Sequence, residues 1–222
     1  NSDSVRNTTV GTNAGDAFSG TDATDNTLIG YDAGTAITSG DNNTAVGRAS
    51  LAANTTASNN TAVGRYSLRT NTTGVNNTAL GRSALDQSTT SDNNTGVGYQ
   101  ALYANTTGGS NTAVGAFAMD AMTTGSSNTA LGQSAAGALT TASNNTALGQ
   151  GSLQATTTGA SNVAVGQGAL YTNTTASNNT AVGKDALYTN TTGDNCVAVG
   201  MRALQTQSTG GNNTAVGLYA LR

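Results

Sequence analysis

A motif of the form Asn-Thr-Ala-Val-Gly returns along this chain at a constant interval, with its glycine at every seventeenth position. Eleven equal intervals without an insertion predict that each repeat is one structural unit stacked on its neighbours. A partial copy, Thr9-Val10-Gly11, precedes Gly30 by slightly more than one interval and is interpreted as an irregular first turn. The glycine of the motif falls at Gly30, Gly47, Gly64, Gly81, Gly98, Gly115, Gly132, Gly149, Gly166, Gly183, Gly200 and Gly217.

The composition limits what such a repeat can build. Leu, Ile, Val and Phe together supply only 32 of 222 residues, whereas Gly supplies 29 and Pro, Trp and His are absent. An ordinary globular domain of this length needs more large apolar residues for its core. A disordered chain usually carries a high net charge, but here the net charge is −3. These values favour a thin, regular architecture that is stabilised by repetition.

We number one repeat from 1 to 17 and place the glycine of the motif at position 6. Positions 2–5 are rich in β-branched residues and positions 9–12 open with Ala-Leu, so each repeat predicts two short strands. The glycine and an Asn-Thr-Thr-Gly-Ser segment supply the turns. The predicted fold is all-β, a parallel β-solenoid of about 12 turns over residues 26–222. Residues 1–25 form an irregular N-terminal segment with the partial first turn.

The variation at each position predicts where the side chains point, because successive strand residues face opposite sides. Position 5 is always Val, Leu or Ile and position 10 is nearly always Leu, so both are expected to face the interior together with position 3. Positions 4 and 9 are then expected to face outward. They hold almost only Ala or Ser, which suggests close packing against a second copy of the chain. Asn at position 2 is predicted to form a hydrogen-bonded ladder, and positions 7, 8 and 11 form the surface.

The motif carries a resemblance to known families. Asn43-Thr44-Ala45-Val46-Gly47 and Asn60-Thr61-Ala62-Val63-Gly64 resemble the repeats in the heads of trimeric autotransporter adhesins of the YadA type. Gly98-Tyr99-Gln100-Ala101-Leu102 is similar to the repeats of phage tail-fibre proteins. The resemblance covers residues 26–222, although the adhesin-head repeat is shorter than the repeat of this chain.

This resemblance implies a left-handed parallel β-roll that assembles as a parallel homotrimer. It also implies an extracellular place, as a virion appendage or on a bacterial cell surface. The function expected from it is that of a structural or adhesive segment of a longer fibre, a rigid spacer that displays a surface to a host glycan or protein receptor.

Catalytic chemistry finds little support in the sequence. Without His or Glu, one chain cannot build a His-based triad, an acid/base Glu or a His-ligated zinc site. The Asp residues are scattered along the repeat, so we expect no enzyme, no metal site and no cofactor.

Eight basic residues form no stripe that would favour nucleic acid. No apolar run approaches the roughly 18 residues of a membrane helix, so no membrane insertion of this segment is expected.

Three tyrosines at position 11 are the receptor-binding candidates: Tyr103, Tyr171 and Tyr188. An exposed aromatic ring at this position can stack on a sugar. The alternative is that these rings pack at the edge between protomers. Cys196, the single cysteine, is interpreted as a small buried filler.

Two further functions stay open. Thr at positions 14 and 15, as in Thr72-Thr73, forms regular rows that could order water, so an ice-binding protein is the main alternative. Against it, paired threonines lie in a predicted turn, and adjacent strand residues would face opposite ways. The other alternative is a purely structural extracellular filament.

Overall fold

The computed structural model describes residues 6–18 and 22–222, and in this part it contains thirteen three-residue strands and no helix. The chain divides into two compact units, Asn1–Ser110 and Asn111–Arg222. Each unit is a parallel β-solenoid in which successive strands pair in chain order. The predicted fold class is therefore confirmed.

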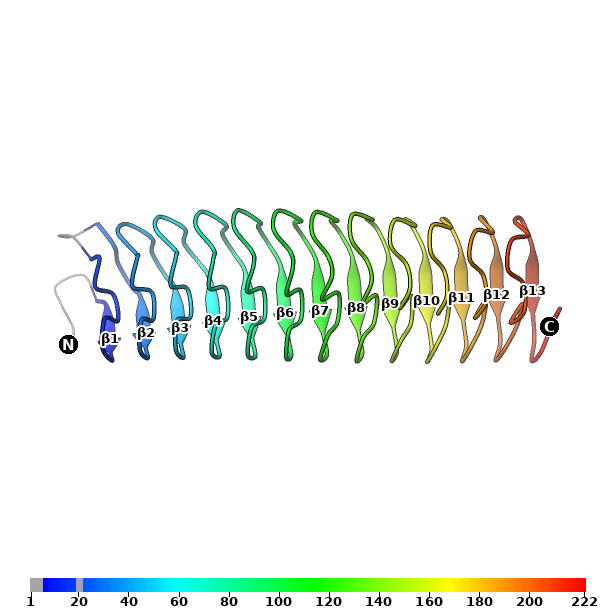
Figure 1. Cartoon of the computed structure of the whole chain (residues 1–222), viewed down its shortest axis with the longest axis horizontal. Helices are drawn as coiled ribbons and strands as arrows, with labels where there is room; N and C mark the ends of the chain where they lie inside the picture. The colour runs from blue at the N-terminus through cyan, green and yellow to red at the C-terminus, as the bar shows by residue number, and fades with distance from the viewer. Residues whose placement is uncertain (1–5, 19–21) are drawn as a thin grey trace. The chain divides into compact units, whose positions relative to one another are not determined.

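In the first unit each strand lies beside the next strand along the chain (Figure 1). Thr8 of the first strand lies opposite Thr27, and after that the register advances by one repeat at each strand, with Thr44 opposite Thr61. Residues 1–5 and 19–21 of the predicted N-terminal segment lie outside the described residues. The strands are β1 (Thr8–Val10), β2 (Thr27–Ile29), β3 (Thr44–Val46), β4 (Thr61–Val63), β5 (Thr78–Leu80) and β6 (Thr95–Val97).

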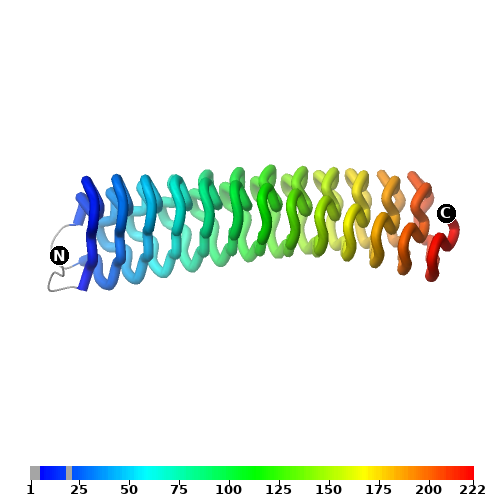
Figure 2. The backbone as a smooth tube through the Cα atoms, turned by 90° about the horizontal axis from the view of Figure 1, so that it is seen from below, coloured from blue at the N-terminus to red at the C-terminus, as the bar shows by residue number. Residues whose placement is uncertain are grey.

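The second unit repeats the same register without interruption. Thr129 lies opposite Thr146 and Ala164 lies opposite Ala181, so equivalent positions stack directly on one another. Figure 2 shows the successive coils of backbone that result. The strands are β7 (Thr112–Val114), β8 (Thr129–Leu131), β9 (Thr146–Leu148), β10 (Val163–Val165), β11 (Thr180–Val182), β12 (Val197–Val199) and β13 (Thr214–Val216).

The second predicted strand, at positions 9–12, is wrong. These residues form turns, with a left-handed backbone at positions 8 and 10, as at Ala49 (φ 53°) and Leu51 (φ 49°). They still bond to neighbouring turns, because the Leu51 N–H donates to Ser67 O at 3.1 Å and the Ala53 N–H donates to Arg69 O at 3.0 Å. The chain must close a complete coil within one short repeat, and this curvature is incompatible with the extended φ of a strand.

The predicted orientation of positions 4 and 5 is also wrong. Ala45 and Ala62 at position 4 are completely buried, whereas Leu80 and Leu131 at position 5 are 47% and 42% exposed. Position 9 is buried too, as at Ala84. The interior of the coil is narrow, so the strand turns a small residue inward in most turns, while the flanking Thr and aliphatic residues face outward. In one turn the buried residue at position 4 is Leu28, and there position 10 is Gly34 instead of Leu.

The core is a column of large side chains packed against small ones. The predicted inward orientation of position 10 is confirmed, since Leu51, Leu68 and Leu153 have no exposed surface. The alanines at positions 4 and 9 complete the interior, and their small size leaves room for the leucine column. Cys196 is buried, as predicted.

The asparagine ladder at position 2 is confirmed. The Asn43 backbone N–H donates to Asn26 Oδ1 at 2.9 Å, and the Asn43 Nδ2 donates to the same oxygen at 3.1 Å and to Ala57 O at 2.9 Å. A second, interrupted column of asparagines at position 13 was not predicted from the sequence. There Asn54 Nδ2 donates to the same Ala57 carbonyl at 2.9 Å. Both columns satisfy backbone groups inside the coil, which would otherwise be buried without partners.

Candidate functional site

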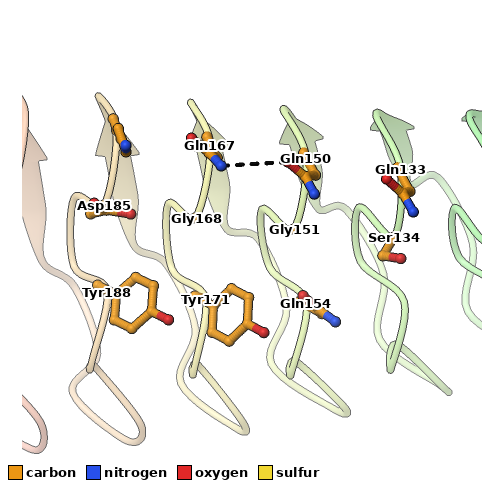
Figure 3. Close-up of a pocket in the computed structure, with 11 residues that line it drawn as sticks. Gln133, Ser134, Gln150, Gly151, Gln154, Gln167, Gly168, Tyr171, Asp185 and Tyr188 are labelled. Atoms are coloured by element: carbon orange, nitrogen blue, oxygen red, sulfur yellow. Dashed lines mark hydrogen bonds between the residues drawn. The ribbon is translucent and has the colours of Figure 1, made fainter.

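Positions 7, 8 and 11 form a surface groove in the second unit. Its volume is about 410 Å³, and it spans several consecutive turns (Figure 3). The scaffold beneath it is the same in every turn, so the groove owes its shape to the residues at these three positions. The lining residues are Gln133, Ser134, Gln150, Gly151, Gln154, Gln167, Gly168, Tyr171, Lys184, Asp185 and Tyr188.

One wall of the groove is a row of side-chain amides. Gln133, Gln150 and Gln167 all occupy position 7, one turn apart, and all three are exposed. Figure 3 shows them in line along the groove. Gln167 Nε2 donates to Gln150 Oε1 at 3.4 Å, near the outer limit of a hydrogen bond. Each amide carries two donors and an acceptor, so the row keeps hydrogen-bonding capacity for a ligand.

The opposite wall contains a pair of stacked tyrosines. The rings of Tyr171 and Tyr188 lie with their centroids 5.0 Å apart and their planes 5° apart. Figure 3 shows them side by side, and Gln154, at the same position of the turn before Tyr171, continues this wall. Both side chains are half-buried. An aromatic pair of this kind offers apolar ring surface beside polar hydroxyl groups.

The floor of the groove depends on two glycines at position 8. Gly151 and Gly168 have φ values of +64° and +67°. A Cβ atom at Gly151 would lie 3.3 Å from the Tyr171 ring, and one at Gly168 would lie 3.4 Å from the Tyr188 ring and 2.7 Å from Asp185 Oδ1. Each tyrosine is thus placed against a glycine of the preceding turn. The missing side chains open the space between the two walls.

Charge is confined to one end of the groove. Lys184 and Asp185 are neighbours on the turn that also carries Tyr188. Asp185 Oδ2 accepts from Arg202 Nε at 3.5 Å, a long ion pair that leaves Asp185 mostly buried. The rest of the lining is neutral. The groove therefore presents no strong field to an acidic or basic ligand.

The structure brings together two of the three predicted tyrosines. Tyr171 and Tyr188 form the stacked pair, whereas Tyr103 belongs to the first unit and is not part of the groove. Position 8 of the turn before Tyr103 is Ser83, so the matched glycine is missing there. A role of these tyrosines in receptor binding stays a prediction.

Sequence analysis missed the amide row and the glycine floor. The signal was present in Gly149-Gln150-Gly151 and Gly166-Gln167-Gly168, where a second glycine stands at position 8. In the second unit only these two turns combine Gly at position 8 with a Tyr at position 11 of the following turn. The pattern joins position 8 of one turn to position 11 of the following turn, so it is not visible when each position is considered by itself.

A second surface runs along the outward face of the strands. We call the position-5 side chains of each unit its aliphatic column, and they are half-buried or exposed in every turn. Position 3, on the same face, holds Thr or Val, so the face contains no charged residue. The columns comprise Val10, Ile29, Val46, Val63, Leu80 and Val97 in the first unit, and Val114, Leu131, Leu148, Val165, Val182, Val199 and Val216 in the second.

The threonine rows at positions 14 and 15 differ in their roles. Thr72 Oγ1 donates to Thr89 O at 3.0 Å, and Thr157 Oγ1 donates to Thr174 O at 3.2 Å, so position 14 ties one turn to the next. Thr73 at position 15 is exposed. Both positions lie outside the strands, as the sequence predicted.

Comparison with family models, with curated proteins and with solved structures finds no match for this chain. Across residues 6–18 and 22–222, no group of three or more Cys and Asp side chains is arranged to hold a metal ion. The same residues include no helix of the length and hydropathy needed to cross a membrane. The stacked scaffold, the groove and the aliphatic column are therefore the observations on which function is argued.

Proposed function

We propose that this chain is a structural and adhesive fibre segment at the exterior of a phage or a bacterium. In this proposal the solenoid is a spacer that assembles with two further copies and displays its variable surface positions to a host receptor. The proposal joins the resemblance of the motifs to the architecture of each unit. It assigns no catalytic activity to the chain.

The aliphatic column is the observation that carries the self-association. Leu80 and Leu131 are 47% and 42% exposed although turns above and below cover part of each side chain. Long rows of exposed aliphatic residues mark interaction surfaces in soluble proteins. The alanines at positions 4 and 9 cannot make this contact, because they fill the interior.

A second copy of the same chain is the partner that fits this column best. Parallel copies place equivalent turns level with each other, so the spacing of side chains in one column matches that of its neighbour. The strand face carries only Thr, Val, Leu and Ile at positions 3 and 5, so like surfaces can approach without charge repulsion. Three copies in cyclic symmetry would enclose the columns.

Light scattering of the whole chain tests this assembly. We expect the mass of three chains for the natural sequence and that of one chain for the double variant Leu131→Lys, Leu148→Lys, because lysine cannot be buried there without a partner. The matched control, Gln133→Lys with Gln150→Lys, adds the same charge at position 7 of the same two turns and should stay trimeric. Circular dichroism establishes that each variant is folded.

Three results would contradict the proposal. A monomeric natural chain at micromolar concentration would exclude self-association through the column. A dimer would exclude the trimer, and long polymers seen by electron microscopy would favour the purely structural filament.

The outward face also gives specific support to ice binding as the second candidate. Thr at position 3 and Val at position 5 form a Thr-x-Val pattern on one side of the sheet, as in Thr44 and Val46. The pattern is irregular, because Leu80 and Leu131 replace Val and Val163 replaces Thr. A crystal lattice requires a uniform face, so we rank this candidate second. A gap between melting and freezing points that the Leu131→Lys, Leu148→Lys variant abolishes would favour it.

A further inference from the structure

We infer that the groove of the second unit binds an uncharged oligosaccharide chain that lies along the stack of turns. This inference rests on the proposed function, since it names the chemical class of the displayed receptor. It uses the groove at positions 7, 8 and 11, which is separate from the aliphatic column at position 5.

The tyrosine pair supplies the apolar half of the recognition. Sugars present C–H groups on the faces of their rings, and these groups pack well on aromatic rings. Tyr171 and Tyr188 offer two nearly parallel rings on consecutive turns, 5.0 Å between centroids. Because both rings are partly buried against the scaffold, little side-chain entropy is lost on binding.

The glutamine row supplies the polar half. Sugar hydroxyls both donate and accept hydrogen bonds, and carboxamides have the same dual capacity. Gln133, Gln150 and Gln167 place one such group on each turn, opposite the wall formed by Gln154 and Tyr171 (Figure 3). A ligand with repeated hydroxyl groups along one direction fits this row better than a compact molecule does.

The glycine floor makes room for the chain. Gly151 and Gly168 lie between the walls in Figure 3, and a Cβ at Gly168 would lie 2.7 Å from Asp185 Oδ1. The volume of about 410 Å³ falls within the usual range of small-molecule sites. The floor ends at the two flanking turns, where position 8 is occupied by Ser134 and by Asp185 instead of glycine.

Other ligand classes fit less well. The lining contains a single cation, Lys184, and lacks the cluster of cations that a phosphorylated, sulfated or acidic chain requires. An extended peptide cannot add to the sheet at this place, because β9, β10 and β11 are each paired on both sides. The combination of stacking rings and amides is that of a site for a neutral saccharide.

The test measures binding of the whole chain to arrayed oligosaccharides. The array contains neutral glucans, mannans, galactans and N-acetylglucosamine oligomers, with sulfated and sialylated chains for comparison. We expect binding to at least one neutral class that strengthens with chain length, followed by calorimetry on that oligosaccharide. Tyr171→Ala and Tyr188→Ala should each weaken it by about tenfold. Tyr31→Ala, at an exposed tyrosine of the first unit, is the control and should leave it unchanged.

A second variant distinguishes the effect of the groove's shape from the effect of removing an aromatic ring. Gly168→Ser fills the floor and keeps both tyrosines, and position 8 already accepts serine at Ser134 with φ 53°. We expect this variant to fold and to bind the oligosaccharide about tenfold more weakly.

The inference is overturned if no neutral oligosaccharide binds, if only acidic chains bind, or if the three groove variants bind as well as the natural chain does. Light scattering on the same samples keeps the two proposals apart. A trimer that fails to bind refutes the saccharide site alone, whereas a monomer that binds refutes the assembly alone.

Discussion

The two units differ in their chemistry at position 7, which holds Arg or Tyr in every turn from Tyr31 to Tyr99 and neither residue in the second unit. In the first unit, arginines and tyrosines interleave at positions 7 and 8, with the Arg65 guanidinium carbon 4.4 Å and that of Arg48 5.9 Å from the centroid of the Tyr66 ring. Arg65 Nη2 donates to the Tyr66 hydroxyl at 3.1 Å, and this hydrogen bond is the main cause of a lowered Tyr66 pKa. In the second unit, position 7 carries Gln133, Gln150 and Gln167 in place of arginine.

This difference separates the scaffold from the functional surface. The marker glycines, the inward alanines and the asparagine ladder are the same in both units, so they are explained by the geometry of the coil. Positions 7, 8 and 11 face the outside of the coil in most turns, with Asp86 a buried exception, and their chemistry can change without changing the fold. Substitutions in the scaffold should therefore affect both units alike, whereas substitutions at these surface positions should leave stability almost unchanged.

Substitution of a marker glycine should damage both units equally. Gly64 has φ +133° and Gly149 has φ +131°, a backbone region that other residues rarely adopt. A Cβ at Gly64 would lie 2.6 Å from Gly81 O, and one at Gly149 would lie 2.7 Å from the Gly166 carbonyl carbon. We expect Gly64→Ala and Gly149→Ala each to reduce the free energy of unfolding by about 3 kcal/mol. Urea unfolding followed by circular dichroism measures the loss.

The controls for these glycine variants are their neighbours at position 7. Arg65→Gln and Gln150→Ala change exposed side chains, and we expect each to alter stability by no more than about 0.5 kcal/mol. If Gly64→Ala were harmless while Gly149→Ala was severe, the two units would not share one scaffold.

Removal of one rung of the asparagine ladder is expected to be the next largest effect. The Asn145 N–H donates to Asn128 Oδ1 at 2.9 Å, and Asn145 Oδ1 accepts from the Asn162 N–H at 3.0 Å. Asn145→Ala would leave the Asn162 N–H buried without an acceptor, at a cost of about 2 kcal/mol. Thr158→Ala, at an exposed position of the same repeat, is the control. Equal melting temperatures for the two variants would contradict the structural role of the ladder.

The repeat explains why so much of the scaffold could be predicted from the sequence. A constant repeat length fixes the register, and the leucine at position 10 and the asparagine at position 2 take the predicted places. The alternation of side chains along the strand was then read with the wrong face for Val46. Sequence variation shows that a position accepts few residue types, but it does not show whether the interior or an outer surface causes this. Position 5 is aliphatic on the outside, and Ala45 is small because the coil is narrow.

The candidate site was less predictable than the scaffold. Position 11 pointed to Tyr171 and Tyr188, because this position follows the leucine and varies mainly among polar and aromatic residues from turn to turn. The groove needs two further features, the row containing Gln150 and the floor at Gly168. The glutamine row and the glycine floor are formed by residues from different turns, so neither can be recognised from the sequence of a single repeat.

Cys196 marks a place where the ladder is incomplete and can be improved. The Cys196 N–H donates to Asn179 Oδ1 at 2.8 Å, as in the other turns of the ladder. In most of those turns the asparagine side chain donates to the backbone carbonyl at position 16. Here the weaker thiol donor takes its place, with Cys196 Sγ 3.4 Å from Gly210 O. An amide at this position could also donate to Asn179 Oδ1, as Asn43 Nδ2 does to Asn26 Oδ1 elsewhere in the ladder. We expect Cys196→Asn to raise the free energy of unfolding by about 1 kcal/mol. Cys196→Ala, which adds no hydrogen bond, should give no gain, and a destabilised Asn variant would refute the prediction.

The smallest effect concerns two carboxyl groups, the buried Asp86 in the first unit and the half-buried Asp120 in the second. Burial raises the pKa of Asp86 although the Arg69 Nε, 2.8 Å from Asp86 Oδ1, acts against it. Burial also raises the pKa of Asp120. The folded chain therefore holds these protons more tightly than the unfolded chain does, so stability should increase as the pH falls through the raised pKa values. The increase should end below the ordinary pKa of Asp.

Urea unfolding across this pH range measures the effect, and the two units can be tested separately. Asp86→Asn should remove the part of the pH dependence that belongs to the first unit, and Asp120→Asn the part that belongs to the second. Asp92→Asn replaces an exposed carboxyl and serves as the control. A natural chain whose stability falls on mild acidification, in step with the Asp86→Asn variant, would mean that burial does not raise this pKa. Such a result would mean that Asp86, at the variable position 11, is solvated in the folded chain.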